Sequence, residues 1–184
     1  EYLRMINHPL DDAAFERVVN TPTRGMGDKT LSQIRELARS TEQSMWQTAI
    51  MMLQEKRLSG RAGNALQGFV DLIMNMSNDI KTLTLDKQAD HAIKASGLFA
   101  MYQTEKGEKA QARVENLEEL VTACKQFEVP LEADDMSPLS AFLAHASLEA
   151  GEGQAEKHQD AVQMMTIHSA KGLEFSLVFL AGVE

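Results

Sequence analysis

TPTRGMGDKTLSQI, residues 21–34, places two glycines one residue apart between two stretches that have the apolar spacing of helices. In residues 12–19 and 29–38, apolar side chains recur every three or four positions. Glycine adopts positive φ readily and lets the backbone approach another molecule closely. The pattern predicts a helix-hairpin-helix-like element with its hairpin at residues 21–30, and Asp28 as the cap of the second helix.

The hairpin has residues that suit contact with phosphate. Free amides at the start of the following helix, near Gly27 to Lys29, would point outward at an anion. Thr23, Arg24, Lys29 and Thr30 would add side-chain contacts, which position a duplex without reading its sequence. An ordinary two-glycine turn between helices has the same spacing, so spacing alone leaves both interpretations open.

The remaining sequence up to about residue 150 predicts a mainly α-helical body. Ser44 and Gln47 have the spacing of a capping box, and Ser137 followed by Pro138 is typical of a helix start. The polar stretch YQTEKGEKAQAR, which begins at Tyr102, predicts a surface loop. We expect further helices at about residues 2–8, 44–53, 61–76, 85–96, 108–127 and 138–149, followed by a polar linker at 151–160.

The end of the sequence has a different pattern. Apolar runs at Val162–Ile167 and Leu177–Val183 flank a polar stretch, His168–Gly172. This arrangement predicts a strand, a turn and a strand, with the turn at the carboxyl end of a strand, where open α/β sheets bind ligands. A solvated turn is the alternative. The stretch is no P-loop, because the pattern GxxxxGK[ST] is absent.

Composition limits the class of protein. With 43% hydrophobic residues, the 184-residue chain can bury a core, and a formal net charge of −9 excludes a uniformly basic, nucleic-acid-coating surface but not a small contact patch. The single cysteine, Cys124, lies in a helical apolar stripe and is expected to be a core residue in a reducing compartment. We expect no metal site, because the histidines lack metal-ligand spacing, and no membrane span.

Four stretches resemble the UvrD/Rep/PcrA group of superfamily 1 DNA helicases. They are DDAAFERVVNTPTRGMGDKTL, RVENLEELVTA, FLAHASLEAGEG and DAVQMMTIHSAKGLEFSLVFLAGVE, in the same order along the chain. The resemblance implies a fragment of a longer helicase: a helical 2B subdomain at 1–150, a linker at 151–160, and a partial RecA-like 2A motor segment at 161–184 that carries motif V. The candidate strands would then belong to a larger α/β sheet.

The resemblance also implies roles for individual residues. The sequence Gly25-Met26-Gly27 resembles the group's duplex-contacting loop, so we expect Thr23, Arg24, Gly25, Met26, Gly27, Lys29 and Thr30 to bind DNA. In motif V, His168 would contact single-stranded DNA, and Glu174 and Gly172 would bind the nucleotide. No catalytic residue is expected in this chain, because it lacks a Walker A lysine, an acidic magnesium motif and the arginine of the sixth motif.

The function implied by the resemblance is that of an ATP-dependent 3′-to-5′ DNA helicase of bacterial DNA repair, cytoplasmic and nucleoid-associated. The parent would use ATP and Mg²⁺, and this chain, unable to hydrolyse ATP alone, would bind duplex DNA and regulate the motor. Its partners would be duplex and single-stranded DNA, the remaining motor domains, and mismatch- or excision-repair proteins. A second hypothesis, favoured by the acidic composition, is an autoinhibitory or protein-docking helical module with negligible DNA affinity. A third is an unrelated helical bundle.

Overall fold

The part of the chain that the structure describes is built of helices. This computed structural model describes residues 1–58, 60–133, 135–151, 164–166, 170, 175 and 177–180, which fall into two units, 1–143 and 144–184. The α-helices are α1 (Tyr2–Asn7), α2 (Asp12–Val18), α3 (Asp28–Thr41), α4 (Met45–Gln54), α5 (Gly60–Asp79), α6 (Leu85–Ala95), α7 (Leu98–Thr104), α8 (Glu108–Gln126) and α9 (Pro138–Gly151), with short 3₁₀ turns η1 (Ile80–Thr82) and η2 (Leu131–Ala133). The predicted mainly α class is confirmed.

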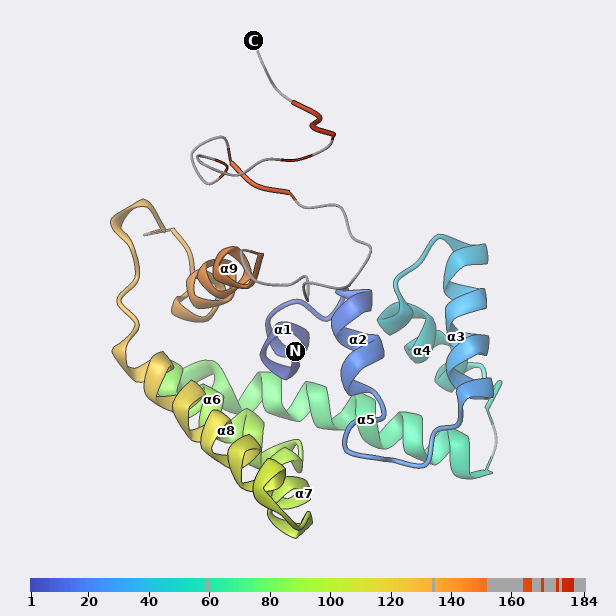
Figure 1. Ribbon diagram of the computed structural model, residues 1–184. Coiled ribbons are helices and arrows are strands. Elements are labelled where there is room, and N and C mark those ends of the chain that lie inside the picture. The colour runs from blue at the N-terminus through green and yellow to red at the C-terminus, as the bar shows by residue number, and fades with distance from the viewer. Residues whose placement is uncertain are drawn as a thin grey trace. The chain divides into compact units, whose positions relative to one another are not determined.

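In the first unit the helices gather around α5, the longest of them (Figure 1). Helices α1, α4 and α6 pack directly on α5, and α2 packs on α1 and α4. Helix α3 packs on α4 at one end of the unit, whereas α7 and α8 pack on α6 at the other end. The segment between α2 and α3, the predicted hairpin, leads from α2 into the start of α3.

Aromatic side chains form the centre of the core. The ring of Phe69 on α5 meets Phe15 of α2 edge-on, with 5.5 Å between centroids, and meets Trp46 of α4 at 6.4 Å. Phe15 and Phe69 are fully buried. Burial of a side chain of this size stabilises the folded state by about 1.5–3 kcal/mol. The three residues therefore determine how α2, α4 and α5 pack together.

Side-chain caps define where several helices begin. The Asp11 carboxylate accepts a hydrogen bond from the amide of Ala14 at 2.9 Å, and Ser44 and Gln47 form the predicted capping box. The Asp12 carboxylate also accepts from the Met45 amide at 2.7 Å, which joins α2 to the start of α4. Each such cap contributes about 1 kcal/mol.

Two expectations differ from the structure. Most of the predicted loop that begins at Tyr102 is helical, because α7 continues to Thr104 and α8 begins at Glu108. Glu, Lys, Gln, Ala and Arg are all good helix formers, and Gly107, at φ 107°, is enough to separate the two helices. Asp28 is not the cap of α3 but its first residue; the cap position is Gly27, which has no side chain to donate or accept.

The second unit contains the end of α9, residues 144–151, and nine described residues after it. The described parts of the two predicted strands, 164–166 and 177–180, contain no β-strand. The rest of both runs, and residues 152–160 of the predicted linker, lie outside the described residues. Among the described residues, no helix is long and apolar enough to span a membrane.

Candidate nucleic-acid interface

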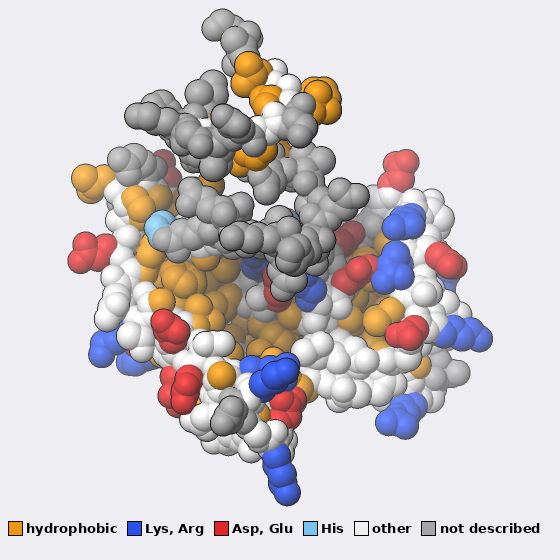
Figure 2. Space-filling model, viewed as in Figure 1, with side chains coloured by type: hydrophobic (Ala, Val, Ile, Leu, Met, Phe, Trp, Pro, Cys, Tyr) orange, Lys and Arg blue, Asp and Glu red, His pale blue; other side chains and the backbone are white. Residues whose placement is uncertain are grey.

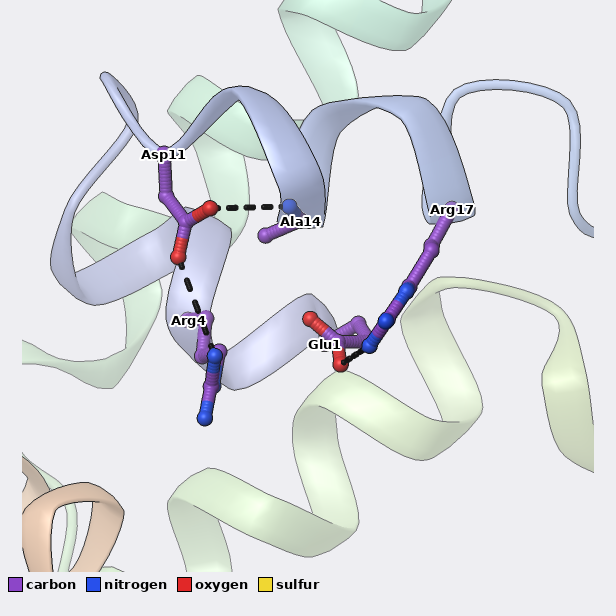
Figure 3. Close-up of polar contacts among 5 residues, drawn as sticks. All are labelled: Glu1, Arg4, Asp11, Ala14 and Arg17. Atoms are coloured by element: carbon purple, nitrogen blue, oxygen red, sulfur yellow. Dashed lines mark hydrogen bonds and ion pairs between the residues drawn. The ribbon is translucent and has the colours of Figure 1, made fainter. Parts of the chain in front are cut away.

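Helices α1 and α2, which precede the hairpin, are joined by exposed polar contacts (Figure 3). Arg17 on α2 donates to the carboxylate of Glu1 at 2.6 Å, and Arg4 on α1 lies 4.0 Å from the Asp11 carboxylate that caps α2. Each exposed ion pair contributes about 0.2–1 kcal/mol. Together with the buried faces of α1 and α2, they orient the C-terminal end of α2, from which the hairpin continues.

Asn20 closes the hairpin across its base. Its side-chain oxygen accepts from the amide of Arg24 at 2.8 Å, and its side-chain nitrogen donates to the carbonyl of Met26 at 2.8 Å. Gly25 adopts φ 82°, in the left-handed region that favours glycine. Sequence reasoning missed Asn20, although an asparagine at the start of a glycine-containing turn commonly bonds the backbone of that turn.

Arg24 lies half-buried beneath the hairpin and not on its outer surface. Its guanidinium donates four hydrogen bonds within the protein: to the carbonyls of Val18 and Pro22, each at 3.0 Å, to the carbonyl of Ser96 at 3.1 Å, and to the hydroxyl of Tyr2. An arginine side chain has five N–H donors. Arg24 therefore joins the hairpin to α1 and to the C-terminal end of α6.

Two further contacts strengthen this attachment. The Tyr2 hydroxyl donates to the carbonyl of Thr21 at 2.6 Å, and the Arg24 guanidinium lies over the ring of Phe69 with 5.5 Å to its centroid. A cation held over an aromatic face is stabilised by roughly 0.5–2 kcal/mol, more when it is removed from water. The sequence predicts Arg24 as a DNA contact; the structure places its side chain in a network of protein contacts.

The other predicted contact residues divide into a buried and an exposed group. Met26 is 3% exposed and belongs to the core, and Thr30 is also buried. Thr23, Gly27 and Lys29 are exposed. Of the predicted contact residues, the segment therefore exposes Thr23, Gly27 and Lys29.

The backbone amides of residues 25–29 are free. Among the described residues, none accepts a hydrogen bond from these amides, and no side chain caps the first turn of α3. Gly27 has φ −86° and ψ 162°, and nothing lies within 4 Å of the position a Cβ would occupy. Free amides at the start of a 14-residue helix bind anions such as phosphate.

The sequence around the hairpin is basic although the whole chain is acidic. Residues 21–62 contain seven Lys and Arg against four Asp and Glu, whereas the whole chain has a formal net charge of −9. Lys and Arg side chains gather, with some Asp and Glu between them, over the end of the molecule formed by α3 and α4 (Figure 2). Arg61, in the first turn of α5, is exposed and lies against Gly25; sequence reasoning did not select it.

The residues predicted for nucleotide and single-stranded DNA contact, His168, Gly172 and Glu174, lie outside the described residues. Of the neighbouring turn, Thr166 is exposed, and its carbonyl accepts from the amide of Ala170 at 3.0 Å. Within the described ranges, no group of His, Cys, Asp and Glu is arranged to hold a metal ion. Cys124 is buried, as predicted, and burial raises the pKa of its thiol to about 11.

Comparisons with known proteins agree with the resemblance. Residues 1–184 match the family described as UvrD-like helicase C-terminal domain. The chain is 57% identical over 183 residues to DNA helicase II of Escherichia coli, 56% identical over 183 residues to DNA helicase II of Haemophilus influenzae, and 35% identical over 189 residues to the ATP-dependent DNA helicase PcrA of Bacillus subtilis.

Each of these alignments covers 100% of this chain and 25% of the relative, so the chain spans about a quarter of the length of the curated relatives it matches. The family match extends over every residue from 1 to 184. On these grounds the chain belongs to the UvrD-like helicase C-terminal domain family.

Proposed function

We propose that this chain is part of an ATP-dependent DNA helicase of bacterial DNA repair that moves 3′ to 5′, and that its helical unit is the duplex-binding subdomain. The relatives that it matches over its full length are named DNA helicase II and ATP-dependent DNA helicase PcrA. In the proposed parent, hairpin 21–30 holds the duplex while the motor domains pull on one strand.

The observation that carries the proposal is the set of backbone amides without an acceptor among the described residues at the start of α3. The free amides of residues 25–29 lie at the start of α3, next to the exposed ammonium of Lys29 and without a side-chain cap. Amides and cations of this kind contact the phosphates of a duplex and fix its position without reading bases. A uniformly acidic chain would repel DNA, but the residues around the hairpin carry an excess of positive charge.

The proposal assigns this subdomain a positioning and regulatory role and leaves ATP hydrolysis to other parts of the parent. ATP and Mg²⁺ would act in the motor, with Glu174 and Gly172 contributing to the nucleotide site and His168 to the single strand. The isolated chain would not hydrolyse ATP. The remaining motor domains and mismatch- or excision-repair proteins are the proposed partners, and the bacterial cytoplasm is the proposed location.

A second candidate function is a protein-docking module that regulates the motor without binding DNA alone. The loop between α8 and α9 favours it, because Leu131 is 93% exposed and Met136 43% exposed near the exposed carboxylates of Glu128 and Asp135. Apolar side chains exposed in an acidic loop suit a partner with a basic, partly apolar surface.

Gly27→Thr is the variant that tests the proposed function. Threonine is β-branched and obstructs close approach to the backbone, and its hydroxyl can occupy the free amides of α3. The fold should tolerate it, because φ at Gly27 is ordinary, the Cβ position is open, and threonine and glycine are similar as helix caps. Gly68→Thr is the matched control, since Gly68 is exposed on α5 with nothing within 4 Å of its Cβ position.

The measurement is fluorescence anisotropy of the chain with blunt duplex and with single-stranded DNA at several salt concentrations. We expect preferential binding of duplex that weakens with salt, and a loss of about tenfold in Gly27→Thr but not in Gly68→Thr. Equal duplex affinity of both variants, with unchanged circular dichroism, would overturn the hairpin assignment. No binding of DNA at any salt concentration would favour the protein-docking module.

A further inference from the structure

Residues 127–137, the α8–α9 connection, join α8 to α9 (Figure 1) and expose several apolar side chains. Among the described residues of the first unit, five large apolar side chains are exposed. Three of them lie in this connection: Val129 at 36%, Leu131 at 93% and Met136 at 43%. Single exposed apolar residues are normal on a protein surface, whereas a group of them marks an interaction site.

Both ends of the α8–α9 connection are attached to the core of the first unit. At its start, the ring of Phe127 meets the ring of Phe142 on α9 edge-on, with 5.3 Å between centroids. At its end, the Ser137 hydroxyl accepts a hydrogen bond from the amide of Ser140 at 3.1 Å, and Leu139 is buried. The exposed apolar residues are therefore carried by a segment that is fixed on both sides.

The middle of the connection has backbone hydrogen bonds of its own. The amide of Ala133 donates to the carbonyl of Pro130 at 2.9 Å, and the amide of Met136 donates to the carbonyl of Ala133 at 2.9 Å. The first of these bonds closes the turn η2, which contains Leu131. A turn that is already formed loses less conformational entropy when it binds a partner. Leu131 is thus an apolar side chain held ready for contact.

The charge of the connection is negative throughout. Residues 126–144 contain four carboxylates, those of Glu128, Glu132, Asp134 and Asp135, and no Lys or Arg. The carboxylates of Glu128 and Asp135 are exposed and form no ion pair within the described part of the chain. Nucleic acids and anionic membranes would be repelled by this charge. Charge complementarity therefore favours a protein partner with Lys and Arg around an apolar contact.

The size of the exposed group indicates a short segment of that partner. Stable complexes between folded proteins bury roughly 1,200–2,000 Å², and three side chains supply only a small part of such an area. An amphipathic helix can place apolar side chains on one face and Lys or Arg beside them. Such a helix meets both the apolar side chains and the carboxylates of the connection, in a weak and reversible complex.

We propose that the α8–α9 connection is a docking surface for a basic, amphipathic helical segment of another protein, with Leu131 as the central apolar contact. The inference names the chemistry of the partner for the second candidate function. It does not depend on DNA binding by the hairpin, which lies in the segment between α2 and α3.

The test titrates the whole chain against a fluorescent leucine–lysine peptide of about 14 residues, which forms roughly four turns of an amphipathic helix. The unaltered chain should bind the peptide with a dissociation constant of roughly 0.1 mM or lower. Leu131→Ser should weaken this binding about tenfold. Leu10→Ser is the matched control, because it removes another exposed leucine of the same unit, and it should change the affinity little.

A second pair of variants tests the carboxylates. Glu128→Gln combined with Asp135→Asn should weaken binding of the peptide and make the affinity less dependent on salt. Glu118→Gln combined with Glu119→Gln alters the net charge equally at two exposed positions of α8 and should have the smaller effect. Equal losses in the two combinations would show a general attraction to an acidic chain and would overturn the proposal.

Other outcomes decide between occupants. Equal affinities of Leu131→Ser and Leu10→Ser, or no binding of the peptide, would overturn the proposal. So would equal binding of a peptide of the same composition whose order gives no apolar face. Self-association of the chain that Leu131→Ser abolishes, measured by sedimentation, would assign the surface to a second copy.

The DNA titration of the same variants separates this proposal from the proposed function. Leu131→Ser should leave duplex affinity unchanged, so either proposal can fail while the other stands. A loss of duplex binding in Leu131→Ser would assign the connection to DNA and overturn the docking proposal. Thermal unfolding of each variant establishes that the fold is kept.

Discussion

The guanidinium of Arg24 donates a hydrogen bond to the carbonyl of Ser96 at 3.1 Å, across 72 residues of sequence. The bond joins the hairpin after α2 to the C-terminal end of α6. Because the same guanidinium also donates to Tyr2 and to two carbonyls of its own segment, the position of the hairpin depends on the packing of α1, α5 and α6.

Arg24→Gln should lower the free energy of unfolding by about 2–4 kcal/mol, because it leaves buried carbonyls without donors. Its effect on DNA binding should be indirect. Duplex affinity should fall because the hairpin is held less firmly, but the slope of log affinity against log salt concentration should stay unchanged, because no phosphate contact is lost. Lys29→Gln is the matched comparison. It should change stability little and should reduce the slope of log affinity against log salt concentration by about 0.9. Urea unfolding and anisotropy titrations measure the two effects. A reduced slope in Arg24→Gln would instead make Arg24 a phosphate contact.

Two glycines of α5 should respond oppositely to alanine. A Cβ at Gly63 would lie 2.8 Å from the carbonyl oxygen of Leu58, a backbone atom that cannot move away easily, whereas nothing lies within 4 Å of the Cβ position at Gly68. Gly63→Ala should destabilise the chain by about 1–3 kcal/mol through overpacking. Gly68→Ala should stabilise it by about 0.5–1 kcal/mol, because alanine lowers the entropy of the unfolded chain.

The check on this pair is the midpoint of urea unfolding for each variant against the unaltered chain. A stabilised Gly63→Ala variant would contradict the close approach of the Leu58 carbonyl to Gly63.

Stability should fall as pH rises above about 8.5. Burial raises the pKa of the Cys124 thiol to about 11, with a further contribution from the Asp86 carboxylate. In the unfolded chain a cysteine ionises near pH 8.5. The folded chain therefore holds a proton that the unfolded chain has lost, so the stabilisation present below about pH 8.5 is lost progressively up to about pH 11.

The same argument applies to Tyr2 at higher pH. Burial raises the pKa of its hydroxyl, although the neighbouring Arg24 guanidinium opposes the shift.

Urea unfolding at pH 7.5, 9 and 10 should give a free energy of unfolding that decreases over this range. Ionisation of the Cys124 thiol in the unfolded chain should account for up to about 2 kcal/mol of the decrease. In Cys124→Ala the decrease should begin only near pH 10. A pH-independent free energy in the unaltered chain would contradict this prediction.

The sequence is sufficient to predict most of the helices because their apolar spacing and caps are local. Asp11, Ser44 and Ser137 each act within three residues of the amide that they cap. Helix α7 was missed because it is only seven residues long and none of its side chains is buried. The two predicted strands cannot be judged by local pattern, since a strand is stable only when another strand pairs with it.

The candidate site was predictable in part. The glycine spacing indicates the turn between α2 and α3, and the amides without acceptors follow from the start of α3. The role of Arg24 depends on contacts that no local pattern encodes. Arg24 has the pattern of a surface residue in a polar turn, and only the fold brings Ser96 and Phe69 beside it.

The network beneath the hairpin has a consequence for genetics. In a mutational scan that selects for loss of duplex binding, Tyr2 and Phe69 should appear together with residues of the loop, although both are buried and cannot reach DNA. Suppressors of such alleles should then be found in helices α1 and α6 and around the loop, wherever a new contact restores its attachment. A phenotypic map of this helical unit would show the buried residues that attach the loop as clearly as the exposed residues of the loop.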